Sequence, residues 1–383
     1  MRPTHATTAE GPAPATTGVG TANLVPLAEV AAGPPPPLAL DARGRPAEPV
    51  LAVSADEFTT LDGDARRRVI AALRGTRRAT VAVAGPGLRV PGELAQSVDL
   101  SLAVASSDGR TIAVPDPLVA LAGVRDRFAS TPLAALTYIW LLRQSAGLPV
   151  AAALSAESAA YSTLLAGPEF AAWLAGRGTP RPPDDRSDRV ATTLAGDVLS
   201  VRLTRPARRN AVDAAMRDAL LAALAPAEWD PALQVDISGA GPSFSAGGDL
   251  DEFGSAVDPA SAHVLRLGAS VAEVLHRLRD RVTVRVHGTC LGAGFELPTF
   301  AGRVVAAPDT VLGLPELAMG LIPGAGGTVG IVRRAGRWRA AWLGLSGIRI
   351  GASTAQQWGL VDEIDDAPAG RSPRTAEEDL LRE

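Results

Sequence analysis

The stretch VRVHGTCLGAGFELPTFAGRVVAAPDTVLGLPELAMGLIPGAGGT, residues 284–328, decides the fold that we expect for this chain. It predicts a buried strand, a glycine turn, a short helix, a second strand, a Pro-Glu corner and a second glycine-rich turn. Glu296 and Glu316 stand in this otherwise apolar frame. Because partial desolvation raises a carboxyl pKa toward neutrality, we expect acid/base chemistry at these two side chains.

Strands and helices alternate ahead of this stretch. Alternation of this kind predicts a mostly parallel α/β core covered by helices. The expected elements are a strand at Val198–Leu203, a helix at Asp213–Leu224, a strand at Gln234–Ser238, a long helix at Pro259–Leu278 and a strand at Val282–Val286.

The N-terminal half has a globular pattern of its own. Its expected elements are strands at Val50–Val53 and Ala79–Ala84, with helices at Asp62–Leu73, Pro132–Gln144, Val150–Leu165 and Pro168–Gly176. The helices carry apolar residues at helical spacing. We therefore divide the chain into a disordered Pro/Ala-rich arm (1–47), a first domain (48–178), a Pro-rich linker (179–194), a catalytic domain (195–366) and a polar tail (367–383).

Composition restricts the possible functions. The 383 residues are 46% hydrophobic with a formal net charge of -4, which argues against general nucleic-acid binding. A single cysteine, Cys290, excludes an intrachain disulfide and is expected to be a buried thiol in a reducing compartment. We expect no metal site, no signal peptide and no membrane span, and hence a cytoplasmic protein.

Two glycine-rich turns can supply backbone amides to a ligand. One is GPSFSAGGDL, residues 241–250, and the other is Gly292-Ala293-Gly294 at the start of a short helix. Free amides from two such turns would form an oxyanion hole, which stabilises negative charge developing on a carbonyl oxygen. Each feature alone also has a structural reading, since glycine turns often follow strands and glutamates often cap helices.

Five motifs, in this order, resemble the crotonase (enoyl-CoA hydratase/isomerase) superfamily over residues 196–364. The motifs are RRNAVD (208–213), FSAGGDL (244–250), HGTCLGAGFEL (287–297), LPELAMGLIPGAGGT (314–328) and GASTAQQWGLVDEI (351–364). The resemblance implies an α/β fold with a crotonase-like ββα superhelix (spiral) core. It also implies an acyl-CoA thioester substrate, no cofactor other than the coenzyme A of the substrate, and a homo-oligomer, either a trimer or a hexamer.

The resemblance also assigns roles to residues. Gly248 and Ala293 would donate the oxyanion-hole amides, with Ala293 replacing the usual middle glycine, which requires that alanine tolerate the local backbone. Glu316 would exchange a proton with the α-carbon and Glu296 would activate or receive water. The residues that would bind the CoA moiety are Arg208, Asn210, Ala246, Asp249 and Leu250.

The glutamate pair favours hydratase chemistry among the possibilities that the family offers. The two lie 20 residues apart (316 minus 296), as in the hydratase pattern. An isomerase can retain only the equivalent of Glu316, and the pair does not exclude that activity. The long N-terminal region also resembles the branch of cofactor-independent dihydroxyphenylacetyl-CoA dioxygenases, although the glutamate at 296 argues against oxygenation. A non-catalytic acyl-CoA-binding partner is the further alternative.

Family members continue into helices that cover the acyl site, whereas this chain ends in a charged run. We expect residues 132–176 to supply that cover, because they resemble those helices. Upstream, residues 85–104 resemble residues 288–307, with Glu93 at the place of Glu296 and Asp116 at that of Glu316. The first domain is therefore predicted to be a degenerate, non-catalytic crotonase-like domain.

Overall fold

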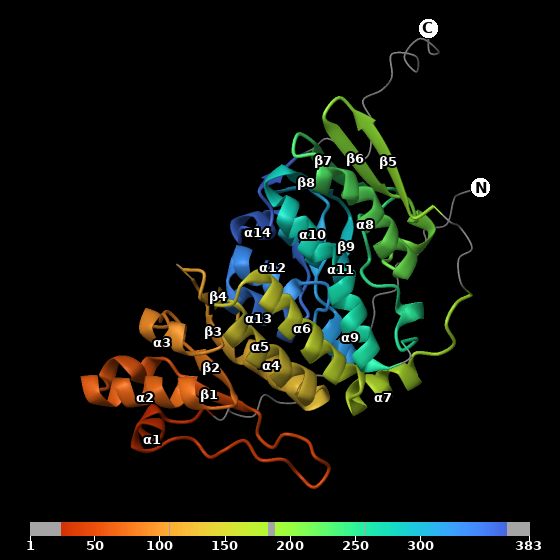
Figure 1. The fold of residues 1–383 in the computed structure, drawn as a ribbon. Coiled ribbons are helices and arrows are strands. Elements are labelled where there is room, and N and C mark those ends of the chain that lie inside the picture. The colour runs from red at the N-terminus through yellow and green to blue at the C-terminus, as the bar shows by residue number, and fades with distance from the viewer. Residues whose placement is uncertain (1–23, 107, 183–187, 257, 366–383) are drawn as a thin grey trace, which may run out of the picture.

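The computed structural model describes residues 24–106, 108–182, 188–256 and 258–365. Within these ranges the strands form a four-stranded, a six-stranded and a three-stranded sheet, with helices packed between and around them (Figure 1). The expected α/β class is therefore confirmed. The four-stranded sheet belongs to the N-terminal half and the other two to the C-terminal half.

The N-terminal sheet is parallel and has the order β1-β2-β3-β4. All five residues of its second strand, ATVAV, are buried, as expected for a parallel strand covered on both faces. Its strands are β1 (Val50–Ser54), β2 (Ala79–Val83), β3 (Leu100–Ala103) and β4 (Thr111–Ala113), and its helices are α2 (Gly63–Gly75), α3 (Gly92–Ser97) and α4 (Pro117–Ser130). Helix α2 begins where the Asp62 side chain accepts a hydrogen bond from the amide of Ala65.

Part of the predicted disordered arm is ordered, which corrects that expectation. Helix α1 (Leu27–Ala32) packs on α2, and its residues Leu27 and Val30 are buried in the core of the N-terminal sheet. The amide of Leu27 donates to the Glu57 carboxylate at 2.8 Å. The apolar side chains of Leu27, Val30 and Ala31 therefore anchor α1 to the core. The proline-rich residues around this helix led to the prediction of disorder. Residues 1–23 of the predicted arm lie outside the described residues, as does the whole of the predicted tail, residues 367–383.

The expected internal repeat has a counterpart in element order. Strands β2 and β3 pair in parallel and are joined by α3, as β8 (Val282–Val286) and β10 (Arg303–Ala306) pair in parallel and are joined through α11 (Ala293–Glu296). The two acids of the N-terminal copy do not meet in a site: Glu93 is exposed, and Asp116 caps α4 by accepting from the amides of Leu118 and Val119. The description of this half as a degenerate crotonase-like domain stays a prediction.

The large sheet of the C-terminal half has the order β13-β10-β8-β7-β6-β5. Its remaining strands are β5 (Val190–Ala195), β6 (Val198–Leu203), β7 (Gln234–Gly239) and β13 (Glu363–Ile364). Strand β5 pairs antiparallel with β6 over six residue pairs, so the C-terminal half begins within the predicted linker. Residues 183–187 of that linker lie outside the described residues.

The small sheet has the order β12-β11-β9 and supports the glycine turns of the site. Its strands are β9 (Thr289–Leu291), β11 (Val311–Gly313) and β12 (Ile350–Gly351). Strand β9 ends one residue before Gly292, and β11 ends shortly before Glu316. Because β9 and β11 run side by side in parallel, both of these residues emerge at the same edge of the sheet.

The predicted long helix at 259–278 is two helices, which corrects that expectation. They are α9 (Pro259–Gly268) and α10 (Val271–Leu278). Between them Ala269 leaves the helical conformation, and the Ser270 side chain accepts from the amide of Glu273 to cap α10. Serine at an N-cap competes with continuing a helix, and a glycine two residues earlier weakens the end of α9.

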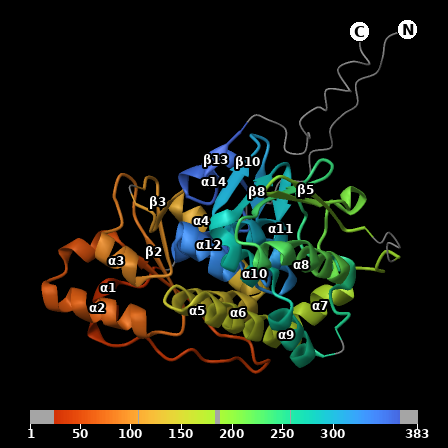
Figure 2. The same ribbon diagram turned by 45° about the horizontal axis from the view of Figure 1, so that its top comes forward.

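Helices from the N-terminal half pack on the C-terminal half. They are α5 (Pro132–Ser145), α6 (Val150–Leu165) and α7 (Pro168–Gly176), and they contact α12 (Gly327–Ala335), α13 (Arg337–Ser346), α9 and the 3-10 turn that begins at Glu316. Figure 2 shows α5, α6 and α9 following one another beneath α10 and α12. The buried hydroxyl of Tyr138 donates to the Ala340 carbonyl at 2.7 Å, which joins α5 to α13.

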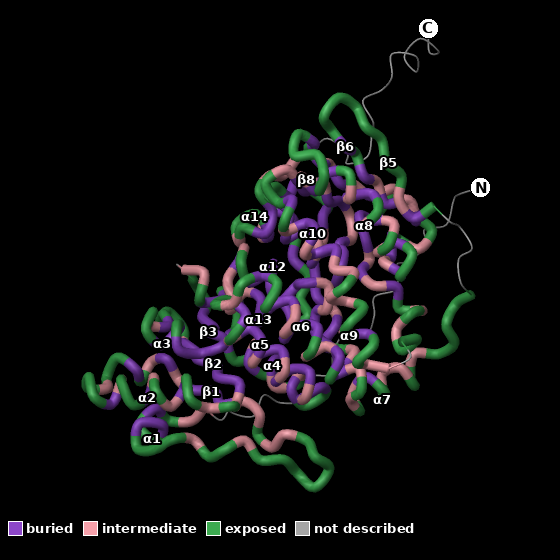
Figure 3. Tube along the Cα trace, viewed as in Figure 1, coloured by how far each residue is buried: buried purple, intermediate pink, exposed green. Residues whose placement is uncertain are grey.

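One apolar core connects the two halves. It includes Val81 and Leu102 of the N-terminal sheet, Tyr138 of α5, Val284 of β8 and Ile331 of α12. Figure 3 shows buried segments continuing from β2 and β3 through α13 into the C-terminal half, while the β5–β6 hairpin is largely exposed. The N-terminal half is thus a structural part of the C-terminal site's surroundings.

Candidate active site

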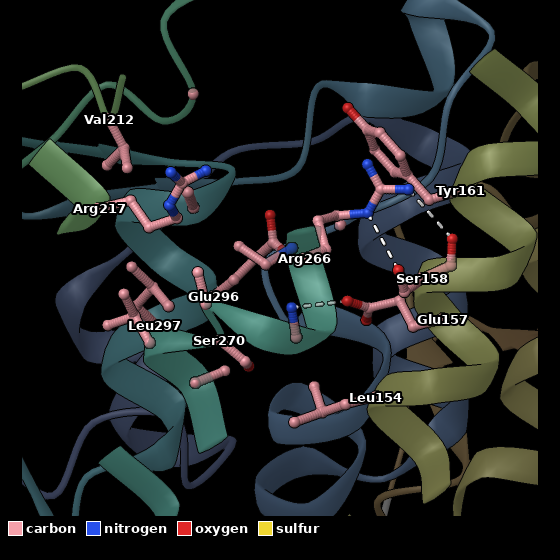
Figure 4. A pocket seen from close by; sticks show the side chains of 18 of the residues that line it. Leu154, Glu157, Ser158, Tyr161, Val212, Arg217, Arg266, Ser270, Glu296 and Leu297 are labelled. Atoms are coloured by element: carbon pink, nitrogen blue, oxygen red, sulfur yellow. Dashed lines mark hydrogen bonds between the residues drawn. The ribbon is translucent and has the colours of Figure 1, made fainter. Parts of the chain in front are cut away.

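A cavity of about 290 Å³ lies between helix α6 and the glycine turns of the C-terminal half. It brings together the four predicted catalytic and oxyanion-hole residues. They are Gly248, Ala293, Glu296 and Glu316. The remaining wall comes from α6, α9 and α10, and from the start of α8 (Ala214–Trp229). Figure 4 shows this cavity with Glu157 on α6 facing the side of Glu296.

Gly248 is held in place by contacts on both sides of it. The carbonyl of Gly247 accepts from the Val212 amide at 2.8 Å, and the amide of Asp249 donates to the Val212 carbonyl at 2.9 Å. Among the described residues, the Gly248 amide itself has no acceptor. A β-carbon on Gly248 would lie 2.9 Å from the Phe253 ring, so this position has no room for a side chain.

The Ala293 amide lies at the first position of helix α11, where amides have no partner within the helix. It too has no acceptor among the described residues. The turn conformation falls on Gly292, with φ 48° and ψ -125°, while Ala293 is absent from the residues with positive φ. Alanine is therefore tolerated at 293 because the preceding glycine makes the turn. Gly294 approaches Ser245 so closely that a β-carbon would clash, which brings the two turns together.

Glu296 projects from α11 and is 2% exposed. One oxygen, Oε2, accepts from the amides of Ala325 and Gly327, both at 2.8 Å. These donors belong to the turn that starts α12, so the carboxylate lies at a helix N-terminus. Burial and the nearby carboxylates of Glu316 and Glu157 nevertheless raise the pKa of Glu296 well above its usual range.

Glu316 starts a 3-10 turn directly after Pro315 and faces the same cavity. Its Oε2 is buried without a hydrogen-bond partner in the described part of the chain. A buried oxygen without a donor raises the free energy of the ionised form, and desolvation raises the pKa of Glu316 to about 8. The pair therefore combines one carboxyl group that accepts two amide hydrogen bonds with one whose Oε2 has no donor among the described residues.

A third carboxyl group, which the sequence reasoning missed, reaches the cavity from the N-terminal half. Glu157 of α6 is 2% exposed, and it accepts from the Gly326 amide at 2.7 Å and from the Thr328 amide at 2.9 Å. The Thr328 hydroxyl also donates to it at 2.6 Å. Burial raises the pKa of Glu157 to about 7, although these donors oppose that shift. The available signal was that Glu157 is the only charged residue in α6, VAAALSAESAAYSTLL.

A cation borders the same cavity. The Arg266 guanidinium of α9 lies 4.7 Å from the ring centroid of Tyr161 and donates to the Ser158 hydroxyl at 3.1 Å (Figure 4). These contacts join α9 to α6. Of the helices expected to cover the site from 132–176, α6 borders the cavity, because its residues Leu154, Glu157, Ser158 and Tyr161 line it.

The five predicted CoA-binding residues do not line the cavity, and two of them are occupied structurally. Asn210 is 0% exposed, and its Nδ2 donates to the carbonyls of Ala240, Ser243 and Phe244. Asp249 forms a buried ion pair with Arg205 at 2.6 Å. Both side chains therefore hold the turn that carries Gly248.

The other three lie closer to the surface. Ala246 is half-buried and Leu250 is 37% exposed. Arg208 pairs with Asp251 at 3.2 Å, and Arg177 and Arg181 of the N-terminal half pair with the same carboxylate. Three guanidinium groups around one carboxylate leave excess positive charge next to the Gly248 turn.

The remaining sequence expectations concern Cys290, a metal site and a membrane-spanning helix. Cys290 is buried, as expected, and burial raises the pKa of its thiol. Among the described residues no three His, Cys, Asp or Glu side chains are grouped as a metal site requires. The helices in these ranges include none with the length and apolar character needed to cross a bilayer.

A family model for enoyl-CoA hydratase/isomerase matches residues 193–369. Residues 193–369 form a crotonase-family domain. Over 168 residues this crotonase domain is 37% identical to the 2,3-dehydroadipyl-CoA hydratase of Escherichia coli K12. The matched region covers 44% of this chain and 65% of the Escherichia coli protein. It is 33% identical over 168 residues to the mevalonyl-coenzyme A hydratase sidH of Aspergillus fumigatus. That match covers 44% of this chain and 62% of the Aspergillus protein.

Solved structures of similar sequence include an enoyl-CoA hydratase from Thermoplasma volcanium. That protein is 35% identical, with 46% of this chain and 72% of that chain covered and a TM-score of 0.43. Of the Escherichia coli and Aspergillus fumigatus hydratases, by contrast, this chain matches less than two thirds of the length. The family model begins at residue 193, so α5, α6 and α7, and Glu157 with them, lie outside the crotonase domain.

Proposed function

We propose that this protein is a hydratase-type lyase that adds water to, or removes it from, the α,β-double bond of an acyl-CoA thioester. The observation that carries the proposal is the shared cavity. Two backbone amides without acceptors in the described part of the chain, at Gly248 and Ala293, and two buried carboxyl groups, at Glu296 and Glu316, border one space. That set can hold a thioester oxygen and move protons at adjacent carbons.

In the proposed hydration, the thioester oxygen accepts hydrogen bonds from the Gly248 and Ala293 amides. Glu296 takes a proton from water as the water oxygen bonds to Cβ, and the electrons of the double bond move toward the thioester oxygen. The resulting enolate is stabilised by the two amides. Glu316 then gives its proton to Cα, and dehydration is the same sequence reversed.

The raised pKa values keep at least one proton on the pair near neutral pH, and the hydrogen bonds distinguish its two members. A general acid must hold a proton near neutral pH, and burial raises the pKa of Glu316 to about 8. Glu296 shares the cavity and accepts two amide hydrogen bonds, which favour its ionised form relative to a carboxyl group without donors. One proton shared by the pair is the state from which hydration starts.

Binding of the CoA moiety is proposed at the surface next to the Gly248 turn. Arg208, Ala246 and Leu250 lie there, and the guanidinium groups around Asp251 favour phosphate. Asn210 and Asp249 would act indirectly, by holding the turn. Double-bond migration needs the same amides and Glu316, so an isomerase remains the second reading of this geometry.

The test is Glu316→Gln assayed with short and medium 2-enoyl-CoA thioesters. The wild type should hydrate at least one of them, and the variant should lose two or more orders of magnitude in kcat because the proton donor to Cα is gone. Product analysis separates the hydroxyacyl-CoA of hydration from a shifted double bond. A wild type without turnover, or a variant with undiminished turnover, would remove this mechanism.

A further inference from the structure

We propose that Glu157, supplied by the N-terminal half, is a positioning residue for Glu296 and a charge partner of the two proposed catalytic carboxyl groups. The inference rests on the proposed function, because it concerns the same cavity. It assigns a working role to a residue outside the family match. The N-terminal half then completes the site chemically as well as sterically.

The first step of the argument is the alternation of hydrogen bonds along one turn. Four consecutive amides, at residues 325–328, donate in turn to Glu296, Glu157, Glu296 and Glu157. Successive amides point to opposite sides of this turn, where Gly326 has φ 101°. The two carboxylates therefore hold the turn from opposite faces, and each fixes the amides that the other uses.

The second step follows from burial. If the Glu157 acceptors were removed, the amides of Gly326 and Thr328 would be left buried without partners, which destabilises the turn in its present conformation. The turn would rotate to pair those amides, and the amides of Ala325 and Gly327 would leave Glu296 Oε2. Catalytic geometry at Glu296 thus depends on a side chain 169 residues before Gly326 in the sequence.

The third step concerns charge. An ionised Glu157 raises the pKa of both Glu296 and Glu316, since a nearby negative charge disfavours a second and a third one. Arg266 acts in the opposite direction on Glu157. The titratable and charged groups that face Glu157 are Glu296, Glu316 and Arg266, together with the tyrosines Tyr138 and Tyr161.

A matched site elsewhere shows what a purely structural glutamate does in the same segment. Glu169 of α7 accepts from the amides of Leu133 and Ala134 at 2.7 and 2.9 Å, at the start of α5. It therefore caps a helix as Glu157 does, but it does not line the cavity. Glu169→Gln provides the control for loss of a partly buried carboxylate from a helix N-terminus.

The experiment compares Glu157→Gln, Glu157→Asp and Glu169→Gln with the wild type by kcat, KM and the pH profile of kcat/KM. Both Glu157 variants should lose at least tenfold in kcat with a smaller change in KM. In Glu157→Gln the alkaline limb should move to lower pH, because removing a negative charge lowers the pKa of the group whose proton is needed. Glu157→Asp keeps the charge and should keep that limb.

Glu169→Gln is the control, and the result of Glu157→Gln decides the role of Glu157. Glu169→Gln should lower the thermal midpoint and leave the limb where it is in the wild type. A Glu157→Gln protein that folds with unchanged kcat and an unchanged alkaline limb would overturn the role of Glu157, while leaving the proposed function intact.

If the wild type turned over no enoyl-CoA, the proposed function would fail, and a titration without substrate would still test the charge coupling. The thermal midpoint of the wild type should fall more steeply between pH 5 and 8 than that of Glu157→Gln, because a carboxyl group with a raised pKa destabilises the fold as it ionises. Equal slopes would refute the coupling.

Discussion

Oε1 of Glu316 packs directly against the α-carbon of Gly292, and a β-carbon at that glycine would lie 2.4 Å from the oxygen. The proposed proton donor therefore contacts the residue that precedes the oxyanion-hole amide of Ala293. Gly292 also has φ 48° and ψ -125°, a conformation that other residues rarely adopt. One glycine thus fixes both the acid and the turn.

Gly292→Ala should impair both at once. We expect kcat to fall by about 100-fold or more, because an oxyanion-hole amide and the acid are displaced together. The free energy of unfolding should fall by roughly 1–3 kcal/mol from the strained backbone. Gly123→Ala is the control: that glycine lies within helix α4 with nothing within 4 Å of an added β-carbon. Unchanged turnover in Gly292→Ala would contradict the proposed placement of Glu316.

The Ala293 amide can be removed without adding a polar group. Proline is favoured at the first position of a helix, so Ala293→Pro should allow α11 to form while deleting its N–H. We expect kcat to fall about 10²- to 10³-fold, as for loss of one oxyanion-hole donor. Ala293→Gly keeps the amide and should retain most of the activity. Circular dichroism and the thermal midpoint check folding, and equal activity of the two variants would refute an amide role.

The three buried carboxyl groups make a prediction for stability against pH. Burial raises the pKa of Glu157 to about 7 and that of Glu316 to about 8, and that of Glu296 is also raised. The folded state therefore binds more protons than the unfolded state above about pH 4.5. By linkage, these groups contribute stability below their unfolded pKa values and lose it as pH rises toward 8.

Denaturant unfolding at pH 5 and pH 8 measures this contribution. The wild type should lose a few kcal/mol more than Glu316→Gln over that interval, because a tenfold difference in proton affinity between the folded and unfolded states corresponds to about 1.4 kcal/mol. Comparing the two proteins isolates the cluster, because all other titrating groups are common to both. An identical pH dependence would show that Glu316 titrates normally.

Sequence pattern identified the elements whose signals are local. Helices α6 and α7 and strands β6 and β8 begin and end where predicted, because turn residues or prolines adjoin clear periodic segments. The predicted helix at 259–278 failed at Ser270, where a local side-chain cap interrupts a hydrophobic pattern that continues past it. Helix α1 was missed because a short apolar face was surrounded by residues typical of disorder.

In the candidate site too, the residues predicted from the sequence are those that lie in local motifs. Gly248, Ala293, Glu296 and Glu316 lie in motifs and meet in one cavity. Glu157 was not predicted as a site residue, since its partners are 169 and 171 residues away and no local pattern links them. Asn210 shows the opposite case: its motif position suggested a ligand contact, yet its amide group holds the backbone of the neighbouring turn.

The position of α6 ahead of the crotonase domain has a consequence for biosynthesis. Translation produces α6 before the sheets of the C-terminal half, whereas the amides that donate to Glu157 belong to a turn made after most of those strands. In a nascent chain the Glu157 carboxylate therefore lacks these amide donors until residues 326 and 328 have been made. The hydrogen bonds of Glu157 can therefore form only after both α6 and residues 326–328 have been synthesised. A fragment limited to the family motifs would lack α6 and, with it, one side of the cavity.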